Sequence, residues 1–165
     1  MTGPAAHESQ WEISEVVFGI PLLISIVMHL VVPLPFAYGA LRLVFIPLGI
    51  ILIAVGIGFI VLARRELAHF GQPTDPGRPT SRIVSSGVFS ISRNPLYLGI
   101  VIVLIGIALA FNGLWILILL LPAVVLCYYV LIFPEERYLS ARFGEEYKAY
   151  TLSVHRWFGR KRITR

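Results

Sequence analysis

Charged residues and cysteines are scarce in this 165-residue sequence. Only 14% of the residues are charged, 57% are hydrophobic, and the mean hydropathy is +0.81. A soluble domain of this length could not bury so much apolar surface, so lipid is predicted to cover the excess. The single cysteine, Cys127, excludes an internal disulfide framework and a cysteine-based metal site. A dinucleotide-binding glycine pattern is also absent.

The net charge of +5 could indicate a nucleic-acid partner. The basic residues flank apolar segments, however, which suits an anionic lipid surface better. We therefore expect the lipid bilayer, and no nucleic acid, as a partner. No break in composition divides the chain, so residues 1–165 are predicted to form one domain.

Four apolar segments predict membrane-spanning helices, at about residues 16–34, 43–63, 95–111 and 114–133. No Lys or Arg precedes the first segment, so it is not read as a cleavable signal. Asn112 and Gly113 form a turn signal that predicts a tight helical hairpin of the third and fourth segments. The expected fold is an all-α integral membrane protein, with residues 16–63 supplying the first two spans.

The basic residues also predict an orientation. With four spans, thirteen of the fourteen Lys and Arg residues fall on one side of the membrane, and Arg42 alone falls on the other. Because positive charge is concentrated on the cytoplasmic side of membrane proteins, both termini are predicted to be cytoplasmic.

The first polar segment covers residues 86–99, with the sequence SGVFSISRNPLYLG. Asn94 can cap a helix whose first residue is Pro95. A helix N-terminus also offers free N–H groups to a carboxylate, so Asn94 is equally a candidate ligand contact. Capping alone leaves Arg93 and Tyr97 unexplained. Arg93 could instead reach lipid phosphate, or hold a carboxylate.

The second polar segment covers residues 133–157. Four apolar or aromatic residues in it share one helical face, which predicts an amphipathic helix along the membrane surface: Leu139, Phe143, Tyr147 and Tyr150. Glu135 and Glu136 stand at the predicted exit of the fourth span. They can be the ordinary acidic first turn of a helix, or carboxylates at the mouth of a partly dry pocket that attract a cation or pair with Arg93.

Two features of the first two spans have structural interpretations. His29 is predicted to be a neutral hydrogen-bonding residue between helices, and no metal site is expected. Gly49, Gly56 and Gly58 are predicted to allow close helix packing.

Together the two polar segments resemble the signatures of the isoprenylcysteine carboxyl methyltransferase and phospholipid methyltransferase superfamily, in its small bacterial form. The first signature centres on residues 92–99. The second comprises the Glu pair, the turn at residues 142–144 and the spacing of Tyr147, Tyr150, Val154 and Arg156. The similarity covers about residues 75–158, the motif-bearing half of the chain. The first two helices match only in being apolar.

The resemblance implies a pocket for S-adenosylmethionine between the loop before the third helix, the hairpin ends and the C-terminal helix, with substrate entering from lipid. It implies Arg93 and Glu136 as catalytic residues. The implied cofactor-binding residues are Gly87, Asn94, Pro95, Tyr97, Gly99, Glu135, Tyr147, Tyr150 and Arg156. The better-known carboxyl methyltransferases have His where this chain has Asn94. Asn does not titrate near neutrality, so no general base is expected at that position.

The resemblance thus predicts a methyltransferase of a bacterial or archaeal plasma membrane that acts on a lipophilic or amphiphilic substrate, most like an isoprenylcysteine carboxyl O-methyltransferase. Three alternatives stay open. The first is phospholipid N-methylation. The second is a sterol-type reductase with a nicotinamide cofactor, for which the chain is short. The third is a non-catalytic scaffold, which would leave the joint presence of Arg93, Asn94, Tyr97 and the Glu pair unexplained.

Overall fold

The computed structural model describes residues 10–73 and 80–161. Most of the Pro- and Gly-rich loop, including Gly77 and Pro79, lies outside these residues, as do the last basic residues, Arg162 and Arg165. The helical elements are α1 (Gln10–Val31), α2 (Leu41–His69), the short 3-10 helix η1 (Gly87–Ser90), α3 (Pro95–Phe111), α4 (Leu114–Cys127), the π-helical segment η2 (Tyr128–Ile132), α5 (Phe133–Phe143) and α6 (Glu145–Ser153). No β-strand occurs in the described ranges, and the predicted all-α class is confirmed.

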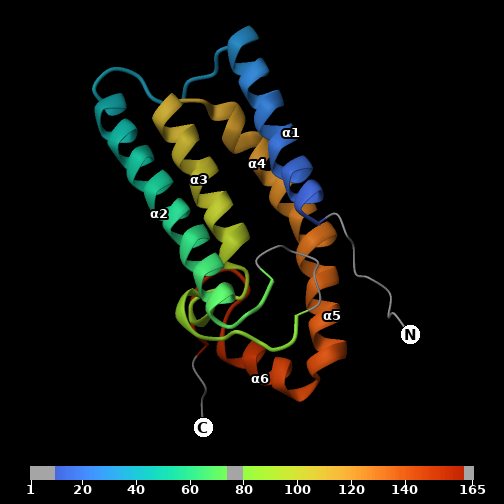
Figure 1. Cartoon of the computed structure of the whole chain (residues 1–165). Helices are drawn as coiled ribbons and strands as arrows, with labels where there is room; N and C mark the ends of the chain where they lie inside the picture. The colour runs from blue at the N-terminus through green and yellow to red at the C-terminus, as the bar shows by residue number, and fades with distance from the viewer. Residues whose placement is uncertain (1–9, 74–79, 162–165) are drawn as a thin grey trace.

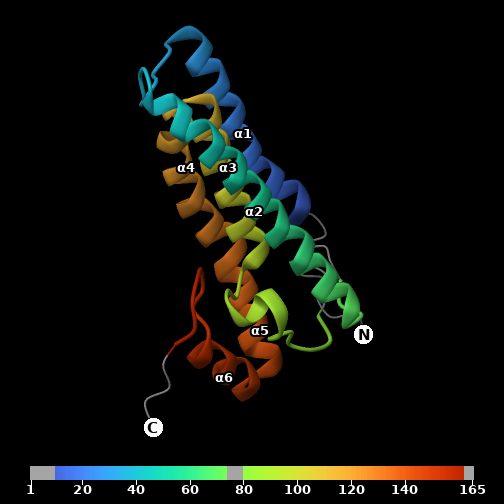
Figure 2. The same ribbon diagram turned by 90° about the vertical axis from the view of Figure 1, so that its left-hand side faces the viewer.

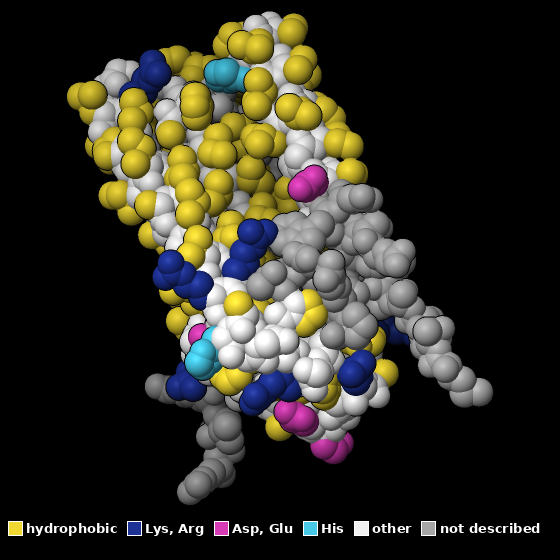
Figure 3. All heavy atoms as spheres, in the orientation of Figure 1, with side chains coloured by type: hydrophobic (Ala, Val, Ile, Leu, Met, Phe, Trp, Pro, Cys, Tyr) yellow, Lys and Arg dark blue, Asp and Glu magenta, His cyan; other side chains and the backbone are white. Residues whose placement is uncertain are grey.

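Three helical stretches are long and apolar enough to cross a membrane: Ser14–Val31, Leu41–His69 and Leu114–Phe143. The third predicted span, α3, is a shorter apolar helix. These helices run side by side in Figures 1 and 2, and α5 and α6 lie at the end where α2 ends and α3 begins. Apolar side chains cover most of the bundle surface in Figure 3, whereas charged side chains gather mainly around the α5–α6 end. Such a surface requires lipid along the bundle and water at its charged end.

Glycines hold α2 against α3. A methyl group added at Gly56 would lie 2.6 Å from the carbonyl oxygen of Gly99, and one added at Gly49 would lie 2.5 Å from that of Gly106. The two backbones therefore touch where no side chain fits, as in other membrane helix pairs. The packing prediction is confirmed for Gly49 and Gly56. A methyl group at Gly58 would meet nothing within 4 Å, so Gly58 does not share this role.

The turn between α3 and α4 is fixed by Asn112, which adopts the left-handed conformation (φ 55°) at the end of α3. Its side-chain oxygen accepts hydrogen bonds from the backbone N–H groups of Phe36 and Ala37, at 3.2 and 2.9 Å, and its amide donates to the Ala37 carbonyl at 2.7 Å. The predicted hairpin is therefore present. Its turn is also joined to the loop between α1 and α2, which the sequence did not indicate.

The fourth span differs from its predicted limits. The helix runs through η2 into α5, which carries it past residue 133 to Phe143, and α6 begins after Gly144 (φ 51°). The predicted surface helix is thus two helices, because Gly144 adopts a conformation that side-chain-bearing residues rarely tolerate. The face predicted for that helix still comes together, since Leu139 and Phe143 pack against the buried Tyr147 and Tyr150.

Candidate active site

The centre of the polar end is Glu136, in the first turn of α5. Arg156 binds it with two hydrogen bonds, from Nε to Oε1 at 2.9 Å and from Nη2 to Oε2 at 2.7 Å. Arg93 Nη1 lies 3.0 Å from the same Oε1. The Glu136 side chain is 15% exposed, so these charge-assisted contacts form in a partly water-free place. The pairing of Glu136 with Arg93, one of the alternatives from the sequence, is what the structure contains.

Glu136 is not at the free start of a helix. The residues before it, η2, are already helical, so the backbone N–H groups there continue the ladder of the fourth span. The π-helical insertion sets the direction in which α5 leaves that span, and such insertions recur at functional sites. A helix dipole interacting with an acidic first turn therefore explains little of the position of Glu136.

Arg93 contacts α5, α6 and the segment that follows α6. Its side chain is 9% exposed, and Nη1 also donates to the Tyr147 hydroxyl at 3.2 Å. Its backbone N–H donates to the His155 carbonyl at 3.1 Å. Its Nε is buried and has no hydrogen-bond partner in the described parts of the chain. In this structure the Arg93 guanidinium faces inward to the Glu136 carboxylate, so it is not directed toward lipid phosphate.

Asn94 precedes α3 but does not cap it with its side chain. Its Nδ2 donates instead to the Arg156 carbonyl at 3.2 Å, and Ser92 Oγ donates to the same oxygen at 3.3 Å. The Gly159 N–H donates to the Ile91 carbonyl at 2.7 Å. The segment after α6 therefore runs along the chain that leads into α3. This antiparallel arrangement places Arg156 opposite Glu136.

Two tyrosines of α6 complete the polar end. Burial raises the pKa of Tyr147 to about 12, with the charge of Glu136 acting in the same direction and Arg93 opposing it. Burial also raises the pKa of Tyr150, whose hydroxyl donates to the Phe89 carbonyl at 2.7 Å. Both phenols thus stay protonated at neutral pH. They act as neutral hydrogen-bonding groups rather than bases.

Tyr97 lies one turn into α3 from Arg93. Its side chain is 4% exposed, and its hydroxyl has no hydrogen-bond partner among the residues described. The Glu135 carboxylate and the Cys127 thiol lie within electrostatic range of this hydroxyl. Pro95 is buried at the first position of α3, where a missing N–H is tolerated. Arg93 Nε, just before α3, and Tyr97 OH, in its first turn, are therefore two buried donors without partners in the described residues, and unpaired buried donors are uncommon in folded proteins.

The two predicted glycines differ in surroundings. Gly87 opens η1 with φ 54°, and a methyl group there would lie 2.8 Å from the Glu66 side chain of α2. Gly99 faces α2, where a methyl group would lie 2.7 Å from Ile60 Cγ1. The structure thus gives Gly99 a packing role, and its contact with a cofactor stays a prediction. Glu66 was missed from the sequence, because a lone acid after two arginines at a helix end carries no signal of its own.

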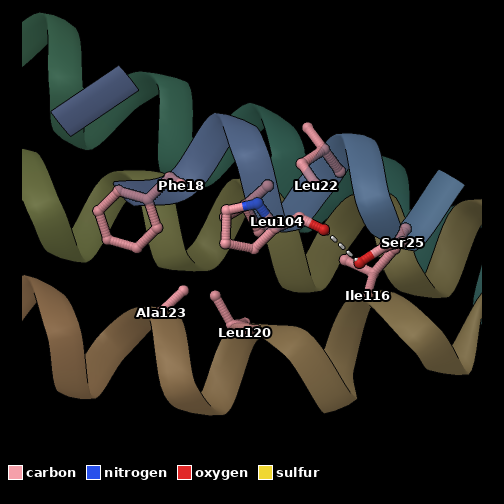
Figure 4. A pocket seen from close by; sticks show the side chains of 8 residues that line it. Phe18, Leu22, Ser25, Leu104, Ile116, Leu120 and Ala123 are labelled. Atoms are coloured by element: carbon pink, nitrogen blue, oxygen red, sulfur yellow. Dashed lines mark hydrogen bonds between the residues drawn. The ribbon is translucent and has the colours of Figure 1, made fainter. Parts of the chain in front are cut away.

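A small cavity of about 10 Å³ lies between α1, α3 and α4 (Figure 4). Its lining is apolar except for Ser25, whose hydroxyl donates to the Pro21 carbonyl at 2.7 Å. Its residues therefore offer no reactive group. His29 Nδ1 is buried without a hydrogen-bond partner in the described ranges, so the expected interhelical hydrogen bond of that atom is not observed.

A helical bundle with an exposed apolar surface and a partly buried cluster of two arginines, a carboxylate and tyrosines at one end defines a membrane protein with a candidate enzyme site. Residues 44–146, more than half of the chain, match the family described as phospholipid methyltransferase. The chain belongs to this family, which lies within the superfamily that its two motifs resemble, and it is accordingly a membrane methyltransferase. No curated protein and no solved structure matches the chain. The family match includes most of α2 and stops before Tyr147, so it is shifted toward the N-terminus relative to the motif resemblance.

Proposed function

We propose that the protein transfers a methyl group from S-adenosylmethionine to a lipophilic or amphiphilic acceptor at the cytoplasmic surface of the membrane. The observation that carries this proposal is the Glu136 carboxylate held between Arg93 and Arg156, beside two buried donors without partners. An ion pair with a purely structural role would not require unpaired hydrogen-bond donors beside it. Family membership supports the reaction class, and the exposed apolar surface supports an acceptor delivered through lipid.

The residues present fit the cofactor. Arg93 Nε and Tyr97 OH are buried donors suited to the carboxylate of a methionine moiety, and Glu135 nearby suits its ammonium group. The other residues proposed to hold the cofactor are Gly87, Asn94, Pro95, Gly99, Tyr147, Tyr150 and Arg156. When bound, S-adenosylmethionine supplies an electrophilic methyl group on its sulfonium sulfur.

The task of the protein is then alignment and exclusion of water, because an in-line displacement needs no covalent intermediate with the chain. Glu136 fixes the two guanidinium groups, and both of its oxygens are occupied by them. Acting as a base would require it to release one of these contacts. An acceptor that is already a carboxylate needs no base, which supports carboxyl O-methylation of the isoprenylcysteine type.

Phospholipid N-methylation is the second candidate, favoured by the description of the matched family. The two acceptors are separated by incubating the purified protein and labelled S-adenosylmethionine with either a prenylcysteine analogue or vesicles containing phosphatidylethanolamine. Base-labile methyl ester on the analogue supports the first candidate. Label in the lipid headgroup, with none in the analogue, overturns it in favour of the second.

Cofactor identity is tested by thermal unfolding of the detergent-solubilised protein. A ligand that binds the native state raises the unfolding temperature, by an amount that grows with the logarithm of its concentration over its Kd. S-adenosylhomocysteine is expected to stabilise the protein and NADPH is not. Stabilisation by NADPH alone would favour the reductase, and stabilisation by neither would favour a scaffold.

The proposed orientation is tested by labelling single cysteines in intact cells, with buried Cys127 as the low background. Tyr38→Cys, at an exposed position in the loop between α1 and α2, is expected to react from outside. Glu145→Cys, at the exposed start of α6, is expected to react only after the membrane is opened. The reverse pattern contradicts cytoplasmic termini. Gly77 and Thr164, two further predicted cytoplasmic positions, lie outside the described residues.

A further inference from the structure

Glu66, near the end of α2, contacts the segment that leads into α3. Its Oε1 accepts a hydrogen bond from Ser86 Oγ at 2.5 Å. Its carboxylate also lies directly against the backbone of Gly87, since a methyl group there would lie 2.8 Å from both Cδ and Oε2 of Glu66. The φ of 54° favours glycine at this point, and an added methyl group would displace the end of the Glu66 side chain.

The short helix η1 that begins at Gly87 is held from its other side as well. Tyr150 of α6 donates to the Phe89 carbonyl at 2.7 Å, and Ser90 Oγ donates to the Gly87 carbonyl at 2.7 Å. Two residues after η1 the chain reaches Ser92, and then Arg93. A displacement of this turn would therefore be passed to the guanidinium at the centre of the site.

Helix α2, which carries Glu66, is held in place because its backbone packs directly against that of α3 at Gly56 and Gly99. Glu66 is the one acidic residue of α2, and the charged residues before it on this helix are Arg42 at its start and the adjacent Arg64 and Arg65. Its carboxylate has the Ser86 hydroxyl as a hydrogen-bond partner at an exposed position. The packing of α2 against α3 does not require an acidic residue at the position of Glu66.

We propose that Glu66 is a positioning residue for the methyl-donor side of the site, which fixes the turn at Gly87 through the Ser86 hydroxyl and contact with the glycine backbone. The inference rests on the proposed function, since the donor is the ligand whose binding this turn would control. It extends the functional residues to α2, most of which lies within the family match.

The test compares Glu66→Ala, Glu66→Gln and Ser86→Ala in the full-length, detergent-solubilised protein, with S-adenosylhomocysteine as the probe. Glu66→Ala is expected to raise the Kd of the probe and the KM for the donor about tenfold, as loss of one charge-assisted hydrogen bond does. The kcat at saturating donor and the KM for the acceptor are expected to change little. Glu66→Gln keeps an acceptor oxygen and the shape of the side chain, so it should restore most of the affinity.

Ser86→Ala removes the same hydrogen bond from the other side, and should add nothing in the Glu66→Ala background, because partners in one contact are not additive. Glu145→Ala is the matched control, an exposed carboxylate paired only with exposed Lys148. Unchanged Kd in Glu66→Ala overturns the proposal, and if that variant does not fold, unchanged Kd in Ser86→Ala does so. Wild-type protein that fails to bind the probe overturns the proposed function instead, which keeps the two failures distinct.

Discussion

Two buried asparagines stand at the two ends of α3 and have opposite surroundings. Asn112, at the turn end, is 6% exposed, and its side chain makes three hydrogen bonds to the loop between α1 and α2. Asn94, at the site end, is 7% exposed, and its side chain makes one, to the Arg156 carbonyl. The Asn112 side chain thus joins the α3–α4 turn to a neighbouring loop, whereas the Asn94 side chain makes a single hydrogen bond at the site end of α3.

The neighbours of the two asparagines extend this contrast. Beside Asn94, Arg93 Nε and Tyr97 OH are buried donors without partners in the described residues. At the turn end, Trp115 Nε1 donates to the Val32 carbonyl at 2.8 Å, and His29 Nδ1 is the exception, a buried atom without a partner. Buried polar groups are normally paired, so spare capacity concentrated at one end indicates where a ligand is expected.

The largest expected effect comes from removing the charge that organises the site end. Glu136→Gln should lower methyl transfer by about two orders of magnitude, because it leaves two arginines without their shared counter-charge in a partly buried place. Turnover of labelled donor is the measurement. Glu145→Gln, whose pair with Lys148 is exposed, should have no effect. Equal behaviour of the two variants would contradict a special role for the site end.

Arg93→Lys changes geometry while keeping charge. Lys cannot bind Glu136, reach Tyr147 and offer Nε at the same time, so methyl transfer should fall tenfold or more, because a charge-assisted contact of this kind contributes roughly 1.5–3 kcal/mol. Circular dichroism and membrane insertion should be unchanged. Full activity would mean that a point charge suffices and that the guanidinium fork has no function here.

The asparagines themselves provide the direct comparison. Asn112→Ala should lower stability by about 2–3 kcal/mol, roughly one for each hydrogen bond lost, and leave the affinity for S-adenosylhomocysteine unaltered. Asn94→Ala should do the reverse, weakening affinity with a smaller loss of stability. Thermal unfolding with and without the ligand measures both. The contrast between the ends fails if both variants lose stability alone.

The smallest effects are expected at the contact between α2 and α3, which lies between the two ends of α3. Gly56→Ala places a methyl group 2.6 Å from the Gly99 carbonyl oxygen, so the helices must separate, at a cost of about 1–3 kcal/mol. Gly58→Ala meets open space and should be neutral or slightly stabilising, since Ala favours helix over Gly. Unfolding temperatures in detergent compare the pair. Identical shifts would refute close packing at Gly56.

The sequence predicted the helical class well, because apolar runs and the Asn112 turn are local signals. The third span agrees at both ends, Pro95 and Phe111. The first helix begins earlier than the predicted span, at Gln10, and ends at Val31, short of the predicted limit near residue 34. The second and fourth helices run beyond their predicted spans, to His69 and Phe143, since helices continue past the apolar run that identifies them. The π-helical segment before Glu136 has no signature in local composition and was not predicted.

The site was predictable only in part. Sequence reasoning selected Arg93, Glu136 and Arg156, and the structure brings these three together. It gave Asn94 a capping side chain as one alternative, and the structure has none, because the Arg156 carbonyl competes for that amide. Contacts of this kind join residues 62 positions apart, and no pattern within either segment reveals them.

The antiparallel contact between residues 91–94 and 155–159 has a consequence for the order in which the protein matures. The helices can enter the bilayer one after another during synthesis, whereas Arg156 and the carbonyl groups that bind Arg93 and Asn94 are translated after every membrane span. The arginine–glutamate cluster is therefore assembled last, on a bundle that is already inserted. A chain arrested before His155 would be anchored in the membrane and still lack the contacts that close its site.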